Sequence, residues 1–93
     1  MDTLTINGIS FRGDTIPLAH VSLLLIQGGK GMLGCGYVSL EAAEKFDDAL
    51  AIVAGVGNYD EMLNATVKKV SSKAAELGVR IGMSGREALL VMA

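Results

Sequence analysis

The most informative stretch of the chain is residues 21–38, which read VSLLLIQGGKGMLGCGYV. Two apolar segments, residues 21–27 and 32–38, flank a glycine-rich turn, and this pattern predicts a β-hairpin. Within the first segment, Leu23–Ile26 is apolar without alternation, so a strand there must be covered on both faces. Because the chain has only 93 residues, we predict that a neighbouring subunit supplies one of the two covers.

A second hairpin is predicted upstream, at the N-terminus. Short alternating runs at residues 4–6 and 9–11 flank Asn7-Gly8, a dipeptide that tolerates the positive φ angles of a type I′ turn. Pro17 lacks the N–H that a central strand would donate, which predicts a connection or an edge there. Residues 1–38 therefore form a predicted β-rich region, and we expect it to be the oligomerisation region.

Residues 39–93 are predicted to contain helices around one inner strand. Ser39 is a good N-cap for a short helix that ends near Phe46, and residues 49–54 follow as a buried strand. The longest helical pattern covers residues 59–77, and its regularly spaced apolar positions predict one continuous helix. These positions are Leu63, Val67, Val70, Ala74 and Leu77.

The C-terminal residues complete the predicted fold. Residues 79–83 predict a short strand or an extended link, and Ser84 with Glu87 forms a capping box that begins a terminal helix. Strands come mostly before helices, which indicates an α+β fold with an antiparallel or mixed sheet. We therefore predict a single domain, residues 1–93, whose sheet consists of N-terminal hairpins plus one inner strand and is packed by two to three helices.

The composition excludes several classes of protein. Hydrophobic residues make up 51% of the chain and charged residues only 19%, which argues against disorder. The 8 basic and 10 acidic residues give a net charge of −2, so we expect no nucleic-acid partner. The longest apolar run, residues 49–56, is far shorter than the roughly 20 residues of a membrane-spanning helix. A single cysteine forms no intrachain disulfide, which fits a cytoplasmic location.

Three groups of residues carry a resemblance to a known family. They are Lys30-Gly31 through Cys35-Gly36-Tyr37, then Gly55-Val56, and Gly82-Met83-Ser84-Gly85-Arg86-Glu87-Ala88-Leu89. With them the chain resembles, from about Pro17 to its C-terminus, the small YunC-like proteins of bacteria and archaea, a domain of unknown function. The resemblance implies an α+β domain whose N-terminal β region joins subunits into a tetramer, and a dimer is the other homo-oligomer that we expect. It implies no activity, substrate or catalytic residue, and the family usually has methionine where this chain has Gly34.

Cys35 is the candidate for covalent chemistry. A nucleophilic thiolate is stabilised by a neighbouring histidine or cation, and His20, the only histidine, and Lys30 are the candidates for these roles. The alternative is that Cys35 is a small buried apolar residue between glycines and that His20 is a structural or interface residue.

A small anion is the other ligand that the sequence suggests. Ser84 and Arg86 stand at a predicted helix start, where backbone N–H groups attract anions, and Asn58 marks a second helix start. Alternatively, Arg86 pairs with a carboxylate of a neighbouring subunit. Residues 29–34 match G-x-G-x-x-G, but no helix is predicted directly after them, so the pattern lacks the context of a dinucleotide site. We expect no metal ion and no cofactor.

Three functions remain open from the sequence alone. The leading one is a cytoplasmic homo-oligomeric domain with a binding or structural role, which the apolar content and the Leu23–Ile26 strand favour. The second is a small enzyme with Cys35 as its nucleophile near a subunit boundary. The third is an anion or nucleotide binder at the Ser84–Arg86 helix start.

Overall fold

The N-terminal half of the sheet grows from the Asn7-Gly8 turn. Both residues have positive φ angles, 51° and 79°, as a type I′ turn requires. This turn joins β1 (Asp2–Ile6) to β2 (Ile9–Pro17), and the two strands pair antiparallel. β3 (Ser22–Gln27) pairs with β2, and β4 (Met32–Gly34) pairs with β3 across the glycine-rich turn. Both predicted hairpins are confirmed.

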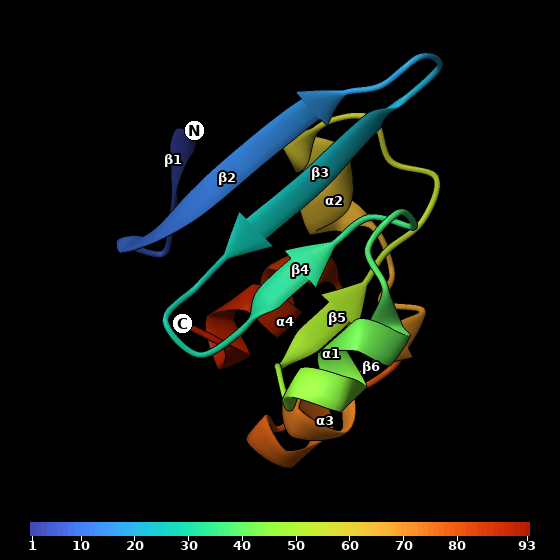
Figure 1. Ribbon diagram of the computed structural model, residues 1–93. Coiled ribbons are helices and arrows are strands. Elements are labelled where there is room, and N and C mark those ends of the chain that lie inside the picture. The colour runs from blue at the N-terminus through green and yellow to red at the C-terminus, as the bar shows by residue number, and fades with distance from the viewer.

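The computed structural model describes residues 1–93 (Figure 1). After β4, the pairing of the strands changes from antiparallel to parallel. α1 (Leu40–Phe46) begins at Ser39, whose side chain accepts the Ala42 N–H, and β5 (Leu50–Ile52) follows. β5 pairs with β4 in parallel, so β4, α1 and β5 form a βαβ unit. The sheet is therefore mixed, and the predicted α+β class is confirmed.

The prediction of a single helix over residues 59–77 is wrong. The chain instead forms α2 (Tyr59–Asn64), β6 (Lys69–Val70) and α3 (Ser72–Leu77). β6 pairs antiparallel with β5 and completes a six-stranded sheet in the order β1-β2-β3-β4-β5-β6. The protein consequently has four short helices, where two to three were predicted.

The physical reason for this break lies in residues 66–71. Thr66, Val67 and Val70 are β-branched, which favours extended backbone over helix. The buried Ser71 hydroxyl accepts the N–H groups of Leu50 and Ala74 and donates to the Asp48 carbonyl, so it both caps α3 and holds β5. Tertiary hydrogen bonds therefore override the helical spacing of the apolar residues.

α4 (Gly85–Val91) ends the chain and begins at the predicted capping box, which is confirmed. The Ser84 hydroxyl accepts the Glu87 N–H at 3.1 Å, and Glu87 Oε1 accepts the Ser84 N–H at 3.0 Å. Gly85 lies so close to α2 that a Cβ there would be 2.1 Å from the Met62 carbonyl oxygen. The predicted segment of residues 79–83 is a link rather than a strand.

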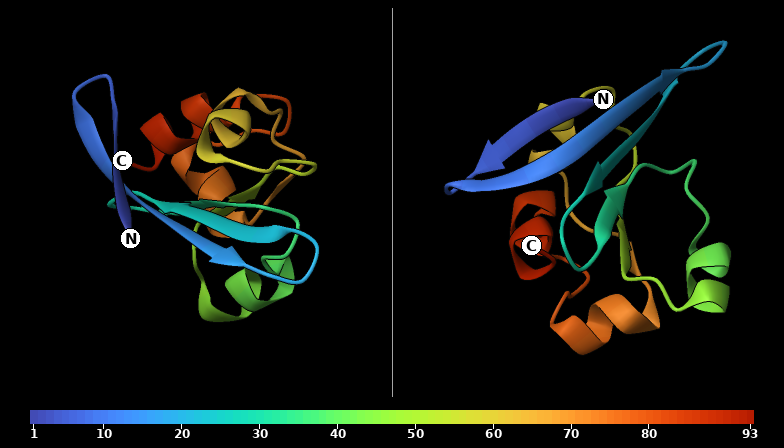
Figure 2. Two further views of the ribbon diagram at one scale, coloured as in Figure 1. Left: turned by 90° about the horizontal axis from the view of Figure 1, so that it is seen from above. Right: turned by 60° about the vertical axis from the view of Figure 1, so that its left-hand side comes forward.

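The helices cover the sheet unequally (Figure 2). α2 and α4 pack on one face, where they enclose the main core. That core includes Ile6, Phe11, Leu24, Ile26, Leu33, Val53, Met62 and Leu89. On the opposite face α1 covers only the β4–β5 end, where Ala43 packs against Leu50 and Ile52. No helix lies over β2 and β3 on that side (Figure 1).

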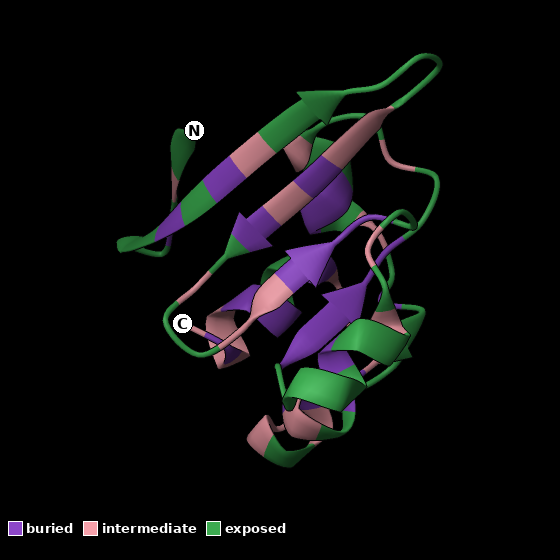
Figure 3. Cartoon of the chain, in the orientation of Figure 1, coloured by how far each residue is buried: buried purple, intermediate pink, exposed green.

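The Leu23–Ile26 strand is therefore covered fully on one side only. Buried and half-buried residues alternate along β3 (Figure 3): Leu24 and Ile26 are buried, whereas Leu23 and Leu25, which pair with Ile16 and Asp14 of β2, are half-buried. Ile16 pairs with Leu23 across the strands and is 52% exposed. None of the four helices has the length and apolar character that a bilayer crossing requires.

Two polar contacts tie distant segments together. The Tyr59 hydroxyl of α2 donates to Asp2 Oδ2 at 2.7 Å and accepts from Thr15 Oγ1 at 3.0 Å, which connects α2 to β1 and β2. Desolvation and the adjacent carboxylates raise the pKa of Tyr59 above its ordinary value.

On the other side of the molecule, the Glu44 carboxylate of α1 accepts the backbone N–H and the hydroxyl of Ser72, the first residue of α3. These hydrogen bonds lower the pKa of Glu44 below its ordinary value. The capping bonds from Ser84 lower the pKa of Glu87 in the same way.

Candidate functional site

The largest pocket of the protein lies at the carboxyl ends of the parallel strands β4 and β5. Its volume is about 490 Å³, within the usual range for small-molecule sites. Carboxyl ends of neighbouring parallel strands are a common place for ligands, because the loops that follow them diverge and leave a crevice. The lining residues are Val21, Ser22, Cys35, Gly36, Tyr37, Gly55, Val56 and Gly57.

Cys35 follows β4 directly and is held by the neighbouring strand. Its N–H donates to the Leu24 carbonyl at 3.1 Å, and its Sγ accepts the Leu24 N–H at 3.2 Å. The residue is only 4% exposed, and its thiol is free. Cys35–Val38 was predicted as strand, but the chain leaves the sheet after Gly34 and turns, with the Val38 N–H bonded to the Cys35 carbonyl. Gly34 permits this turn because a Cβ there would lie 2.7 Å from Val38 Cγ2.

The opposite wall is the β5–α2 loop. Gly55 has φ +72°, a left-handed conformation that favours glycine. The loop is fixed at both ends, because the Val53 N–H donates to the Gly34 carbonyl and the Gly57 N–H donates to Glu61 Oε1 at 2.6 Å. Gly55 and Val56, which form one of the groups that carry the family resemblance, therefore line the same pocket as Cys35, which belongs to another of these groups.

The residues that line this pocket offer unbonded backbone N–H groups and no charged side chain. The N–H groups of Gly36, Tyr37, Gly55 and Val56 make no hydrogen bond within the chain. No Lys, Arg, His, Asp or Glu lines the pocket. The arrangement can therefore offer hydrogen bonds to an acceptor atom but no opposite charge to an ion.

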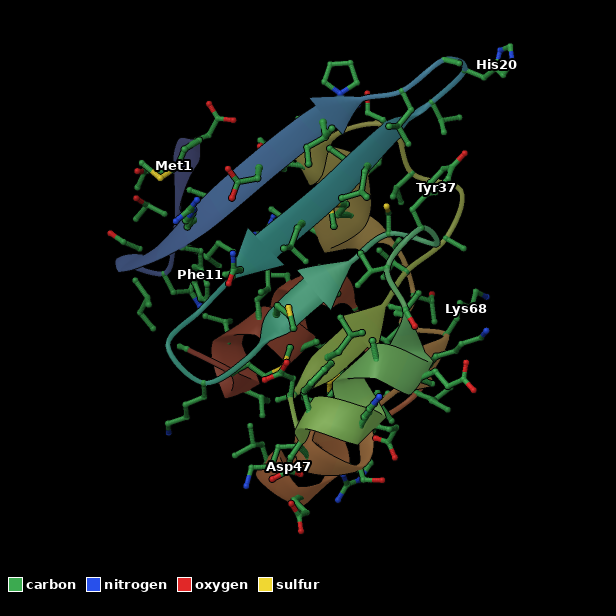
Figure 4. All side chains as sticks on the ribbon, viewed as in Figure 1. Met1, Phe11, His20, Tyr37, Asp47 and Lys68 are labelled. Carbon is green, nitrogen blue, oxygen red and sulfur yellow. The ribbon has the colours of Figure 1, made fainter.

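The structure does not bring His20 or Lys30 to Cys35. His20 lies exposed at the tip of the β2–β3 loop and points away from the molecule (Figure 4). Lys30 lies in the β3–β4 turn, at the other end of the sheet, where its N–H donates to the Met92 carbonyl at 2.8 Å. Neither residue lines the pocket, so Cys35 has no histidine or cation beside it there.

The three remaining candidate residues are at helix starts. Asn58 Oδ1 accepts the Glu61 N–H at 2.8 Å and thus caps α2. Ser84 uses its hydroxyl and its N–H in the capping box, so Glu87 already supplies the carboxylate at that helix start. Arg86 is exposed and makes no ion pair within the chain. No group of three His, Cys, Asp or Glu side chains could hold a metal ion.

Sequence reasoning missed the other side of the pocket, namely Ser22, Tyr37 and the loop 55–57. One signal was present. Two glycines, Gly55 and Gly57, follow the predicted buried strand, and a glycine loop after an inner strand is typical of a binding loop. The parallel pairing of β4 with β5, which brings this loop to Cys35, has no counterpart in the local sequence pattern.

This fold and pocket define a class of protein: a small α+β domain in which one βαβ unit presents a glycine-lined crevice beside an N-terminal β-meander. The chain belongs to the family described as "Domain of unknown function (DUF1805)", whose model matches residues 34–92. This confirms the family that the resemblance indicated.

Two relatives extend the similarity over almost the whole chain. The "Uncharacterized protein YunC" of Bacillus subtilis is 32% identical, and the alignment covers 96% of this chain and 92% of that protein. The crystal structure of TA1206 from Thermoplasma acidophilum, a protein of unknown function, superimposes with a TM-score of 0.93 at 32% identity. It covers 99% of this chain and 90% of the other.

Proposed function

We propose that the protein is a self-associating cytoplasmic domain that forms a homo-oligomer through the uncovered side of β2 and β3. The observation that carries this proposal is a cluster of large aliphatic side chains, called here the β2–β3 apolar surface. It consists of Ile16, Leu18, Val21, Leu23 and Leu25. Ile16 pairs with Leu23 across the two strands, and Leu18 and Val21 lie in the loop that joins them, where the Leu18 N–H donates to the Val21 carbonyl. Ile16, Leu18 and Val21 are 52%, 42% and 49% exposed, and large exposed apolar residues that lie close together usually mark an association site.

The charges on the same side support a second copy of the chain as the partner. Arg12 and Asp14 lie beside Ile16 on β2 and form an ion pair at 3.0 Å. A twofold contact presents the same patch on both subunits, so each Arg12 can meet the Asp14 of the other copy. In such a contact the apolar residues of the two copies pack together and their opposite charges can pair, so the patch is complementary to a second copy of itself.

The test is the oligomeric state of the wild type and of two lysine variants. Sedimentation at micromolar concentration should give an oligomer for the wild type, and Ile16→Lys should shift the distribution to the monomer. Ile81→Lys is the matched control, because Ile81 is 66% exposed but lies in the α3–α4 loop, outside the surface. A wild-type monomer, or equal dissociation by the two variants, would contradict the proposal.

A small enzyme with Cys35 as nucleophile is the second candidate. The supporting observation is that Cys35 lines the largest pocket, and that Val21, which also lines it, belongs to the β2–β3 apolar surface. The pocket would then lie near the subunit boundary. Alkylation by iodoacetamide tests this: an activated thiol reacts in the folded protein at neutral pH, and reaction only after unfolding in urea would contradict the idea.

The Ser84–Arg86 helix start remains a prediction as an anion or nucleotide site. The capping box occupies the Ser84 groups that an anion would need, so no feature of the fold favours this function over the other two. A rise in melting temperature with a phosphate compound, absent in Arg86→Gln, would favour it.

A further inference from the structure

We propose that the pocket at the carboxyl ends of β4 and β5 binds a small uncharged molecule with an apolar body and a carbonyl-type acceptor oxygen. This inference goes beyond self-association, and the two proposals share one residue, Val21, which lines the pocket and belongs to the β2–β3 apolar surface. The pocket of about 490 Å³ is built within one chain, from the β3 start and the loops that follow β4 and β5.

The lining determines the charge of the ligand. Val21, Val56 and the ring of Tyr37 supply apolar contact, and glycine backbone makes up much of the rest. Because no charged side chain lines the pocket, an anion would lose its hydration without gaining an opposite charge. An uncharged ligand does not carry this cost.

The unpaired N–H groups determine the polar part of the ligand. Gly36 and Tyr37 on one loop, and Gly55 and Val56 on the other, offer backbone donors that no group of the chain uses. Ser22 adds a hydroxyl to the lining, whereas Tyr37 is 60% exposed and its hydroxyl points away from the molecule (Figure 4). Unbonded donors in both loops that line the crevice match a ligand that carries an acceptor oxygen, such as an amide or a ketone.

Both loops are held in place before any ligand binds. Residues 35 and 38 are joined by a backbone hydrogen bond at 3.0 Å, and Asn58 and Glu61 fix the end of the second loop. A pre-formed site binds its ligand without an additional cost for ordering the loops. The residues that line the pocket therefore select the ligand by shape and by hydrogen bonding.

Benzamide and benzoate are a matched pair of probes, since they share a ring and a carbonyl and differ in charge. Two-dimensional ¹⁵N NMR of the wild-type chain, titrated with each compound, should show saturable shifts of the Gly36, Tyr37, Gly55 and Val56 amides with benzamide. Benzoate should bind about tenfold more weakly or less. Equal binding of the two compounds would overturn the uncharged ligand, and no saturable shift with either would overturn the site.

A blocking variant locates the binding. Gly36 lines the pocket and a Cβ there meets no atom within 4 Å, so Gly36→Val can fold and adds bulk at a lining position. Benzamide binding should be lost in Gly36→Val and retained in Ala54→Val, a control beside Gly55 that does not line the pocket. If Gly36→Val fails to fold, Val56→Trp serves the same purpose. Retained binding in the folded blocking variant would overturn the proposal.

The test is separable from that of self-association. The same titration on Ile16→Lys should give the same shifts, because Ile16 does not line the pocket. Benzamide binding by a wild-type chain that sediments as a monomer would support the pocket while contradicting the proposed oligomer. Conversely, an oligomer that gives no saturable shift would overturn the pocket alone.

Discussion

The two ends of the sheet differ in how their common outer face is protected. Over β4 and β5, α1 covers Leu50 and Ile52, which are almost completely buried. Over β2 and β3 there is no helix (Figure 1), and Ile16 and Leu23 remain partly open to solvent. The βαβ unit brings its own cover because a parallel crossover needs a helix, whereas a hairpin needs only a turn. Antiparallel pairing thus leaves the apolar surface for which we propose a second subunit.

The largest difference between the two ends should appear in the effect of removing an apolar side chain. Leu50→Ala leaves a cavity under α1 and should lower the free energy of unfolding by about 2–5 kcal/mol. Ile16→Ala should change the free energy of unfolding of the dilute chain by less than about 0.5 kcal/mol, as exposed sites do. Urea unfolding followed by circular dichroism measures both. Comparable losses would mean that the two ends are protected alike.

A smaller effect is expected for the contact that ties the β1–β2 end to α2. Tyr59→Phe removes the hydrogen bonds to Asp2 and Thr15 and should cost about 1 kcal/mol. Because the pKa of Tyr59 is raised in the folded chain, its stabilisation is present below the ordinary tyrosine pKa and is lost as the pH rises through the raised value. The wild type should therefore lose more stability than Tyr59→Phe in alkaline urea titrations. Identical alkaline profiles would contradict this.

The smallest effect is expected at the covered end, where Glu44 joins α1 to α3. Its pKa is lowered in the folded chain, so its stabilisation is present above the ordinary carboxyl pKa and is lost as the pH falls through the lowered value. Glu44→Gln should lower the free energy of unfolding at neutral pH and leave it unchanged in acid. The free energy of unfolding of this variant should therefore fall less steeply than that of the wild type as the pH is lowered, which urea unfolding at several pH values measures. Glu41→Gln, on the same helix, removes no hydrogen bond and is the control. A shallower pH dependence of stability in Glu41→Gln, or an unchanged one in Glu44→Gln, would contradict the role of the Glu44–Ser72 hydrogen bonds.

The part of the fold that depends on local chemistry could be predicted from the sequence. Asn7-Gly8 specifies its turn through two positive φ angles, and Ser84 with Glu87 specifies a capping box three residues apart. The pattern of residues 59–77 misled because strand β6 and two short helices place the same apolar residues in the core as one long helix would. The spacing of apolar residues indicates which residues are buried but not which backbone conformation they adopt. Here the hydrogen bonds of Ser71 to Leu50 and Asp48 favour the extended backbone of β6 over a continuous helix.

The candidate site could be predicted only in part. Cys35 was identified by its chemistry, and it lines the pocket. Its neighbours depend on strand order, because the pairing of β4 with β5 brings the loop 55–57 to it, while His20 and Lys30 belong to turns that point elsewhere. Which loops meet at one edge of a sheet is a property of the whole topology, and short stretches of sequence do not encode it.

Gly85, one of the residues that carry the family resemblance, allows α4 to pack directly against α2. Backbone of α4 touches backbone of α2 there, and even a methyl group would force the two helices apart. In this chain the contact distance alone therefore excludes any larger residue at position 85 unless the two helices shift. The contact between α2 and α4 at Gly85 therefore fixes how these two helices pack over the sheet, at the opposite end of the chain from the β2–β3 apolar surface.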